Sequence, residues 1–103
     1  MHIVIFCETL ILARDISREI VLGICDHVNG RTNYAGMRIE IDSKNIRIDI
    51  RHADIEKTIA LRPDYVLFYD TSVDFDKEYE RRMYGRYKEL KSVKDVIELV
   101  IGK

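Results

Sequence analysis

Residues 3–28 read IVIFCETLILARDISREIVLGICDHV and decide the fold. Residues 3–7 are a continuous β-branched and aromatic run, which is typical of a strand buried on both faces. Thr9 is a suitable N-cap for a helix over residues 10–28, in which apolar residues recur every four positions along one face. The Asn-Gly pair at 29–30 favours a helix end because it accepts positive φ. A buried strand followed by an amphipathic helix predicts an α/β fold.

Two strands with one buried face follow at residues 37–42 and 46–51, where isoleucine or methionine alternates with charged residues. A turn at 43–44 places two pairs of opposite charge across this hairpin, whereas a turn at 44–45 keeps one attraction and creates two repulsions. Cross-strand pairs contribute roughly 0.2–1 kcal/mol each, so the first register is favoured. It pairs Ile41 with Ile46, Glu40 with Arg47, Ile39 with Ile48, and Arg38 with Asp49.

The remaining segments supply one more strand and three helices. Residues 65–69, YVLFY, are a second apolar run of the kind that is buried on both faces. Residues 31–35 form a polar connection. The expected helices cover residues 55–61, 76–90 and 93–101, the first capped by Asp54 and stopped by Pro63, the last opened by a Ser92 and Asp95 capping box.

These elements predict one α/β domain over residues 1–103. Its mixed sheet has about four strands, includes the hairpin and is covered by helices, in the order β-α-β-β-α-β-α-α. The two apolar strands are expected side by side in the centre of the sheet, because strands buried on both faces need neighbours and cover. The hairpin is expected towards one edge.

Composition excludes several classes of protein. The chain has 17 basic and 18 acidic residues and a net charge of −1, so no overall charge drives it to nucleic acid or anionic lipid. No apolar run approaches the ~20 residues of a membrane helix, and residues 1–3 lack the features of a signal peptide. Cys7 and Cys25 lie inside apolar patterns, which favours a reducing compartment. We therefore expect a cytoplasmic protein without a membrane partner.

Acidic residues follow both apolar strands. If these strands are parallel neighbours, Glu8, Asp70 and Asp74 are candidate ligands of Mg²⁺, because open α/β sheets bind ligands beyond the carboxyl ends of their strands. The alternative is that Asp74 or Asp76 caps the helix that follows. No cofactor is expected under this alternative.

Residues 3–8 and 65–70 resemble the glutamate-ended and aspartate-ended strands of the Toprim domain of topoisomerases and primases. The resemblance implies a metal-dependent enzyme of phosphotransfer. The family has Asp-x-Asp where this chain has Asp70-Thr71-Ser72, so Asp74 would have to supply the second acid.

Residues 1–75 also resemble a P-loop ATPase core of the phage-terminase kind in the order of their elements. That resemblance implies a Walker B role for Asp70. Glu8-Thr9-Leu10-Ile11 stands where the phosphate-binding loop belongs, without its glycines and lysine. The resemblance therefore implies a degenerate relative without hydrolysis.

Basic and aromatic residues share the helix expected at 76–90. Arginine with tyrosine can serve phosphates and stacked bases, whereas the glutamates on the same helix favour an ordinary solvated face. The candidate nucleic-acid-binding residues are Arg81, Arg82, Tyr84 and Arg86.

A partner surface is the remaining candidate. Tyr34 is the single aromatic residue of a polar loop, and such loops often carry recognition. The last helix is apolar nearly all round, so Val96 and Val100 either pack on the chain's own sheet or are covered by a second copy. We expect a small non-catalytic module that binds a protein partner and self-associates, of a kind that suits a phage or other mobile element. The alternatives are a nucleic-acid or nucleotide binder and a Toprim-like enzyme.

Overall fold

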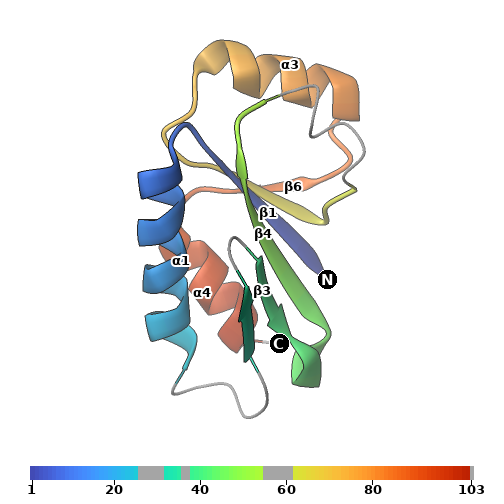
Figure 1. Ribbon diagram of the computed structural model, residues 1–103. Coiled ribbons are helices and arrows are strands. Elements are labelled where there is room, and N and C mark those ends of the chain that lie inside the picture. Colours follow the sequence, from blue (N-terminus) through green and yellow to red (C-terminus); the bar gives the residue numbers. More distant parts are fainter. Residues whose placement is uncertain (26–31, 36–37, 55–61, 103) are drawn as a thin grey trace.

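The two apolar strands lie side by side at the centre of one sheet in the computed structural model (Figure 1). The structure describes residues 1–25, 32–35, 38–54 and 62–102. Strand β1 (His2–Cys7) pairs in parallel with β5 (Tyr65–Phe68) on one side and with β4 (Ile46–His52) on the other. This confirms the predicted centre of an α/β domain. Its radius of gyration of 13.0 Å matches the ~13 Å of a compact domain of this length.

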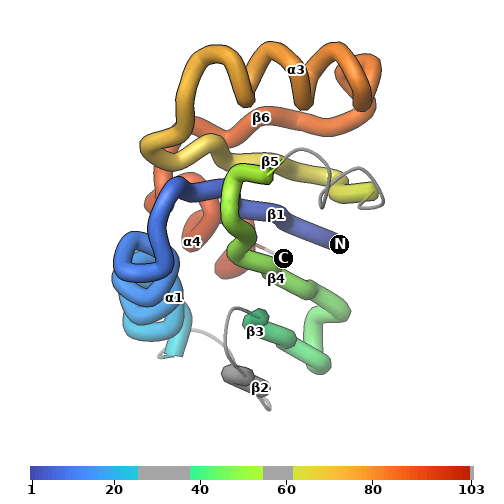
Figure 2. Tube along the Cα trace, turned by 45° about the horizontal axis from the view of Figure 1, so that its top comes forward, coloured from blue at the N-terminus to red at the C-terminus, as the bar shows by residue number. Residues whose placement is uncertain are grey.

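The sheet has six strands, in the order β2-β3-β4-β1-β5-β6 (Figure 2), where about four were predicted. Strand β3 (Arg38–Ile41) forms the antiparallel hairpin with β4, and the predicted register is confirmed at all four residue pairs. The additional strands are the two edges, β2 (Thr32–Ala35) and β6 (Lys88–Leu90). Both strands are too short to show a clear period-2 pattern in the sequence. Pairing with the neighbouring strand stabilises them, and that pairing is a tertiary feature.

Two helices begin at their predicted caps. Helix α1 (Leu10–Ile24) starts where the Thr9 hydroxyl accepts the N–H of Leu12 at 3.2 Å. Helix α4 (Val93–Ile101) starts where the Ser92 hydroxyl accepts the N–H of Asp95 at 3.2 Å. The predicted end of the first helix at 28 and the predicted helix at 55–61 lie outside the described residues.

Helix α3 (Val73–Met83) differs from the predicted helix over 76–90 at both ends. Its N-cap is Ser72, whose hydroxyl accepts the N–H of Phe75 at 3.1 Å, so the expected capping by Asp74 or Asp76 was wrong. Both acids lie in the first turn instead, where a carboxylate favours the positive end of the helix dipole. The helix ends because Tyr84 and Gly85 both have positive φ, which turns the chain back into β6.

Helices cover the two faces of the sheet unequally (Figure 1). Helices α1 and α4 pack on the face that carries the hairpin isoleucines and Ile3, Ile5 and Cys7. On the other face, α3 covers the valines and aromatic residues of β1 and β5. The part of that face formed by β3 and β4 carries charged side chains instead. In the described residues no helix is long and apolar enough to span a membrane.

Candidate functional site

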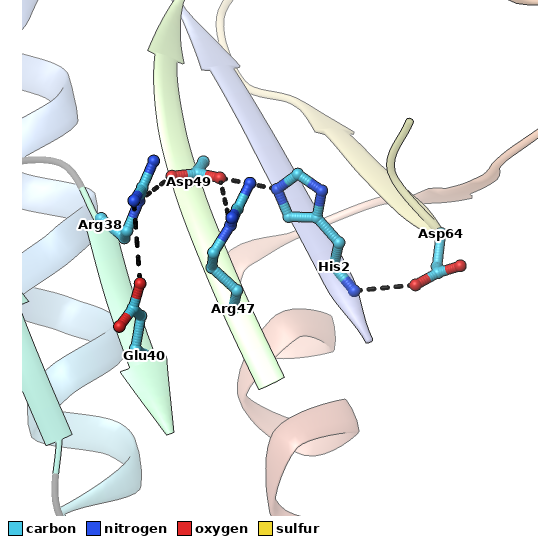
Figure 3. A network of polar contacts seen from close by, with 6 residues as sticks. All are labelled: His2, Arg38, Glu40, Arg47, Asp49 and Asp64. Atoms are coloured by element: carbon cyan, nitrogen blue, oxygen red, sulfur yellow. Dashed lines mark hydrogen bonds and ion pairs between the residues drawn. The ribbon is translucent and has the colours of Figure 1, made fainter. Parts of the chain in front are cut away.

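A buried carboxylate organises the charged part of the sheet (Figure 3). The side chain of Asp49 is 2% exposed, and its Oδ1 accepts from Nε of Arg38 at 2.9 Å. Its Oδ2 lies 2.7 Å from Nε2 of His2 and accepts from Nε of Arg47 at 3.0 Å. Burial favours the neutral acid, but these bonds outweigh it, so the pKa of Asp49 lies below its ordinary value of 3.8. The network therefore ties β1, β3 and β4 together around one charge.

Both arginines of this network bind Asp49 through Nε, the inner nitrogen of the guanidinium. Their side chains are 44% and 43% exposed, so the terminal nitrogens remain accessible. Nη1 of Arg38 lies 3.8 Å from Oε1 of Glu40, which is a loose ion pair at the surface. The hydrogen bond to Asp49 raises the pKa of Arg38 and holds its fork in one orientation. A fixed guanidinium fork suits carboxylate or phosphate oxygens.

A pocket of about 530 Å³ opens beside the network, at the carboxyl ends of the parallel strands β1 and β4. This is the edge at which open α/β sheets bind ligands, and the volume is that of an ordinary ligand site. Sheet residues and the first turn of α1 supply an apolar floor, and charged residues form the rim. The pocket is lined by Cys7, Thr9, Leu10, Ala13, Arg38, Asp49, Ile50, Arg51 and His52.

The thiol of Cys7 in this pocket is not set up as a nucleophile. Its Sγ donates to the carbonyls of Thr9 at 3.6 Å and Arg51 at 3.8 Å. Burial, together with the charge of Glu8, raises the pKa of Cys7, so the protonated thiol prevails at neutral pH. Cys7 therefore contributes an apolar surface to the pocket.

The strand ends that carry Glu8 and Asp70 are parallel neighbours, as predicted. Oε1 of Glu8 accepts the backbone N–H of Ser72 at 3.3 Å, while Asp70 and Asp74 are exposed. Within the described ranges, no three His, Cys, Asp or Glu side chains are grouped in a way that could hold a metal ion. The structure thus does not gather Glu8, Asp70 and Asp74 into the predicted Mg²⁺ site, because Glu8 instead bonds the start of α3.

The predicted nucleic-acid-binding residues do gather, at the C-terminal end of α3. Arg81 and Arg82 both bind Glu78, at 2.6 Å and 2.7 Å, and these bonds lower the pKa of Glu78 to about 2. Tyr84 is 81% exposed, and the guanidinium of Arg86 lies 5.8 Å from the centre of its ring. The four residues therefore form one exposed corner.

The predicted partner residues lie on different elements. Tyr34 lies on the edge strand β2, opposite Ile39 of β3. Val96 and Val100 are fully buried in the chain's own core, on α4 beneath α1. The interpretation that a second copy covers these valines was wrong, because one side of the short helix is already occupied within the chain.

The sequence singled out none of the pocket residues Leu10, Arg38 and Arg51, nor the central site residue, Asp49. In the alternating strand it looks like any solvated charge, since period-2 patterns do not say which polar residues a neighbouring strand covers. The available signal was the hairpin register, which already placed Arg38 opposite Asp49. The contact of His2 with Asp49 could not be predicted, because it depends on the parallel pairing of β1 with β4.

Comparisons with known proteins identify no relative of the chain, so its function is inferred from the geometry of the site. No protein-family model, no curated protein and no solved structure matches the chain. The Toprim and P-loop resemblances rest on the residues quoted for them alone.

Proposed function

We propose that the chain is a small non-catalytic binding module that holds an acidic and apolar segment of a protein partner in the pocket between α1 and β4. The observation that carries this proposal is the pairing of an apolar floor with a guanidinium fork that a buried carboxylate orients. The pocket lies at the edge of the sheet where ligands of α/β proteins bind.

The apolar half of the pocket is complementary to an aliphatic side chain. Leu10 lines the pocket and is 58% exposed, while Ala13 and Ile50 behind it are buried. Covering apolar surface contributes about 25 cal/mol per Å², so a partner's leucine, isoleucine or valine placed here would be bound favourably.

The rim of the pocket is complementary to a carboxylate. Arg38 is held by Asp49 before any ligand arrives, so little side-chain entropy is lost on binding. Arg51 and His52 stand exposed on the same rim. An aspartate or glutamate next to an aliphatic residue would satisfy both halves of the pocket.

The raised pKa of Cys7 supports binding rather than covalent chemistry at this site. Both cysteines are free, which supports a cytoplasmic setting as part of the proposal. Self-association remains a prediction, but the buried Val96 and Val100 are not proposed as its interface.

A displayed library of random peptides, selected on the immobilised chain, tests the proposal. The enriched peptides should place an aliphatic residue beside Asp or Glu, and their synthetic forms should bind in fluorescence polarisation. Full burial of a leucine contributes about 1.5–3 kcal/mol, and the 58% of Leu10 that is exposed accounts for the lower part of this range. Replacing Leu10 by Ser should therefore weaken binding roughly tenfold. Arg51→Gln should weaken binding several-fold through the lost charge.

Two residues of α1 provide matched controls. Leu22 is 67% exposed and Arg18 is exposed, and neither lines the pocket. Leu22→Ser and Arg18→Gln should therefore leave peptide binding unchanged. Enrichment of basic peptides, enrichment without a shared pattern, or equal losses in the control variants would each refute the proposal.

A further inference from the structure

Helix α3 ends in an exposed tyrosine with a left-handed backbone. Tyr84 has φ 53° and ψ 32°, a conformation that costs free energy for any residue with a Cβ and that helix ends usually give to glycine or asparagine. Its side chain is 81% exposed, so packing in the core does not offset this cost. A residue kept in a disfavoured conformation with its ring in solvent suggests a role for that ring outside the fold.

Two arginines, Arg81 and Arg86, interact with Tyr84. The guanidinium of Arg86 stacks over it at 5.8 Å, which leaves the opposite side of the ring uncovered by this contact. Glu78 and, to a smaller extent, the Tyr84 hydroxyl raise the pKa of Arg81, so Arg81 and Tyr84 lie within electrostatic range. Three hydrogen bonds from Arg81 and Arg82 to Glu78 hold both arginines in place. Three arginines and one glutamate leave the corner with a net positive charge.

We infer that the corner formed by Arg81, Arg82, Tyr84 and Arg86 binds single-stranded nucleic acid, with a base stacked on the Tyr84 ring and phosphates on the arginines. Every base offers a flat π-face, so such contacts tolerate many sequences. A duplex keeps its base faces stacked inside, so single strands are preferred. The corner shares no residue with the pocket of the proposed function, and neither inference depends on the other.

Titration of the chain into fluorescein-labelled oligonucleotides of about 12 nucleotides tests the inference. Single-stranded DNA, single-stranded RNA and duplex DNA form the three arms, and the first two show which sugar is accepted. Raising the salt from about 50 to 200 mM should weaken single-strand binding roughly tenfold if two or three phosphates are contacted.

Two substitutions at Tyr84 separate recognition from folding. Tyr84→Gly should weaken single-strand binding roughly tenfold, since one stacked base is lost, whereas Tyr84→Phe should bind like the original chain. Glycine accepts a positive φ, so the thermal midpoint of Tyr84→Gly should equal or exceed that of the original chain. A purely structural role of Tyr84 would lower that midpoint.

A matched pair of double variants tests the charge. Arg81→Gln with Arg86→Gln should lose most single-strand binding, and Arg14→Gln with Arg18→Gln on α1 should retain it at the same net charge. The inference is overturned if neither single strand binds at low salt, if Tyr84→Gly binds as tightly as the original chain, or if both double variants lose binding equally.

Discussion

Replacing Asp49 by asparagine is the most direct perturbation of the network that joins β1, β3 and β4. The carboxylate is 2% exposed and serves three donors, from His2, Arg38 and Arg47. An amide presents one oxygen and one NH₂ group in the same space. In either orientation of the asparagine side chain, its NH₂ group faces an arginine N–H whose hydrogen bond a carboxylate oxygen accepted before.

The expected loss in the free energy of unfolding follows from the hydrogen bonds that Asp49→Asn removes. Hydrogen bonds to charged groups contribute about 1.5–3 kcal/mol each, and the amide forfeits at least one bond and the charge that strengthens the others. Arg38 and Arg47 are 44% and 43% exposed, so water partly replaces what they lose. We expect Asp49→Asn to lower the free energy of unfolding by about 3 kcal/mol, a large part of the ~5–15 kcal/mol of a typical domain.

Urea unfolding at two pH values is the assay. The folded pKa of Asp49 lies below its ordinary value of 3.8, so the ionised group stabilises the fold above that value. This stability is lost as pH falls through the folded pKa. The difference between the original chain and Asp49→Asn should therefore be full at neutral pH and shrink at about pH 3. Asp15→Asn on the exposed side of α1 is the control and should change stability little.

Two results would refute this reasoning. One is a free energy of unfolding for Asp49→Asn within about 0.5 kcal/mol of the original chain, the range of ordinary surface substitutions. The other is a difference of the same size at both pH values, which would mean that the charge of Asp49 does not carry the effect.

Two further predictions concern packing and thiol chemistry. An alanine Cβ at Gly23 of α1 would lie 2.6 Å from Cδ1 of Ile97 of α4. Overpacking costs about 1–3 kcal/mol and the helix propensity of alanine offsets about 1 kcal/mol of it, so Gly23→Ala should lower the free energy of unfolding by up to about 2 kcal/mol. Adding Ile97→Val, which removes Cδ1, should restore much of this loss. Additive effects in a double-mutant cycle would contradict this contact. Cys25 is exposed and should react quickly with a disulfide reagent, whereas Cys7 is buried with a raised pKa and should react much more slowly in the folded chain. Equal rates for the two thiols would show that Cys7 is not enclosed.

The hairpin shows why some features of the fold were predictable. Its register follows from a period of two, a short turn and two pairs of opposite charge, all within residues 38–49, and the structure has the same pairs. The caps at Thr9 and Ser92 were equally local, since each involves an N–H three residues away. The predicted bounds of α4, residues 93–101, are confirmed as well. The contact that caps its C-terminus was not predictable in this way, because Nζ of Lys44, distant in the chain, donates to the carbonyls of Val100 and Ile101.

The end of α3 shows why other features were missed. The spacing of Tyr79, Met83 and Tyr87 fits a helix, and the first two are indeed on its buried side. Tyr87 instead follows the turn at Tyr84 and joins the same aromatic cluster from the approach to β6. A single left-handed residue changes the path of the chain while the apolar spacing stays the same.

The sequence by itself determined the α/β class, the central pair of strands and the hairpin register, because apolar runs, period-2 alternation and caps act over short distances. Only the tertiary structure decided which charged side chains are buried and bonded and which stay exposed. Asp49 is buried because Arg38, Arg47 and His2 cover it from three strands, whereas Asp70 and Asp74 stay in solvent. Burial of a polar group depends on neighbours that are distant in the chain, and no local pattern records them.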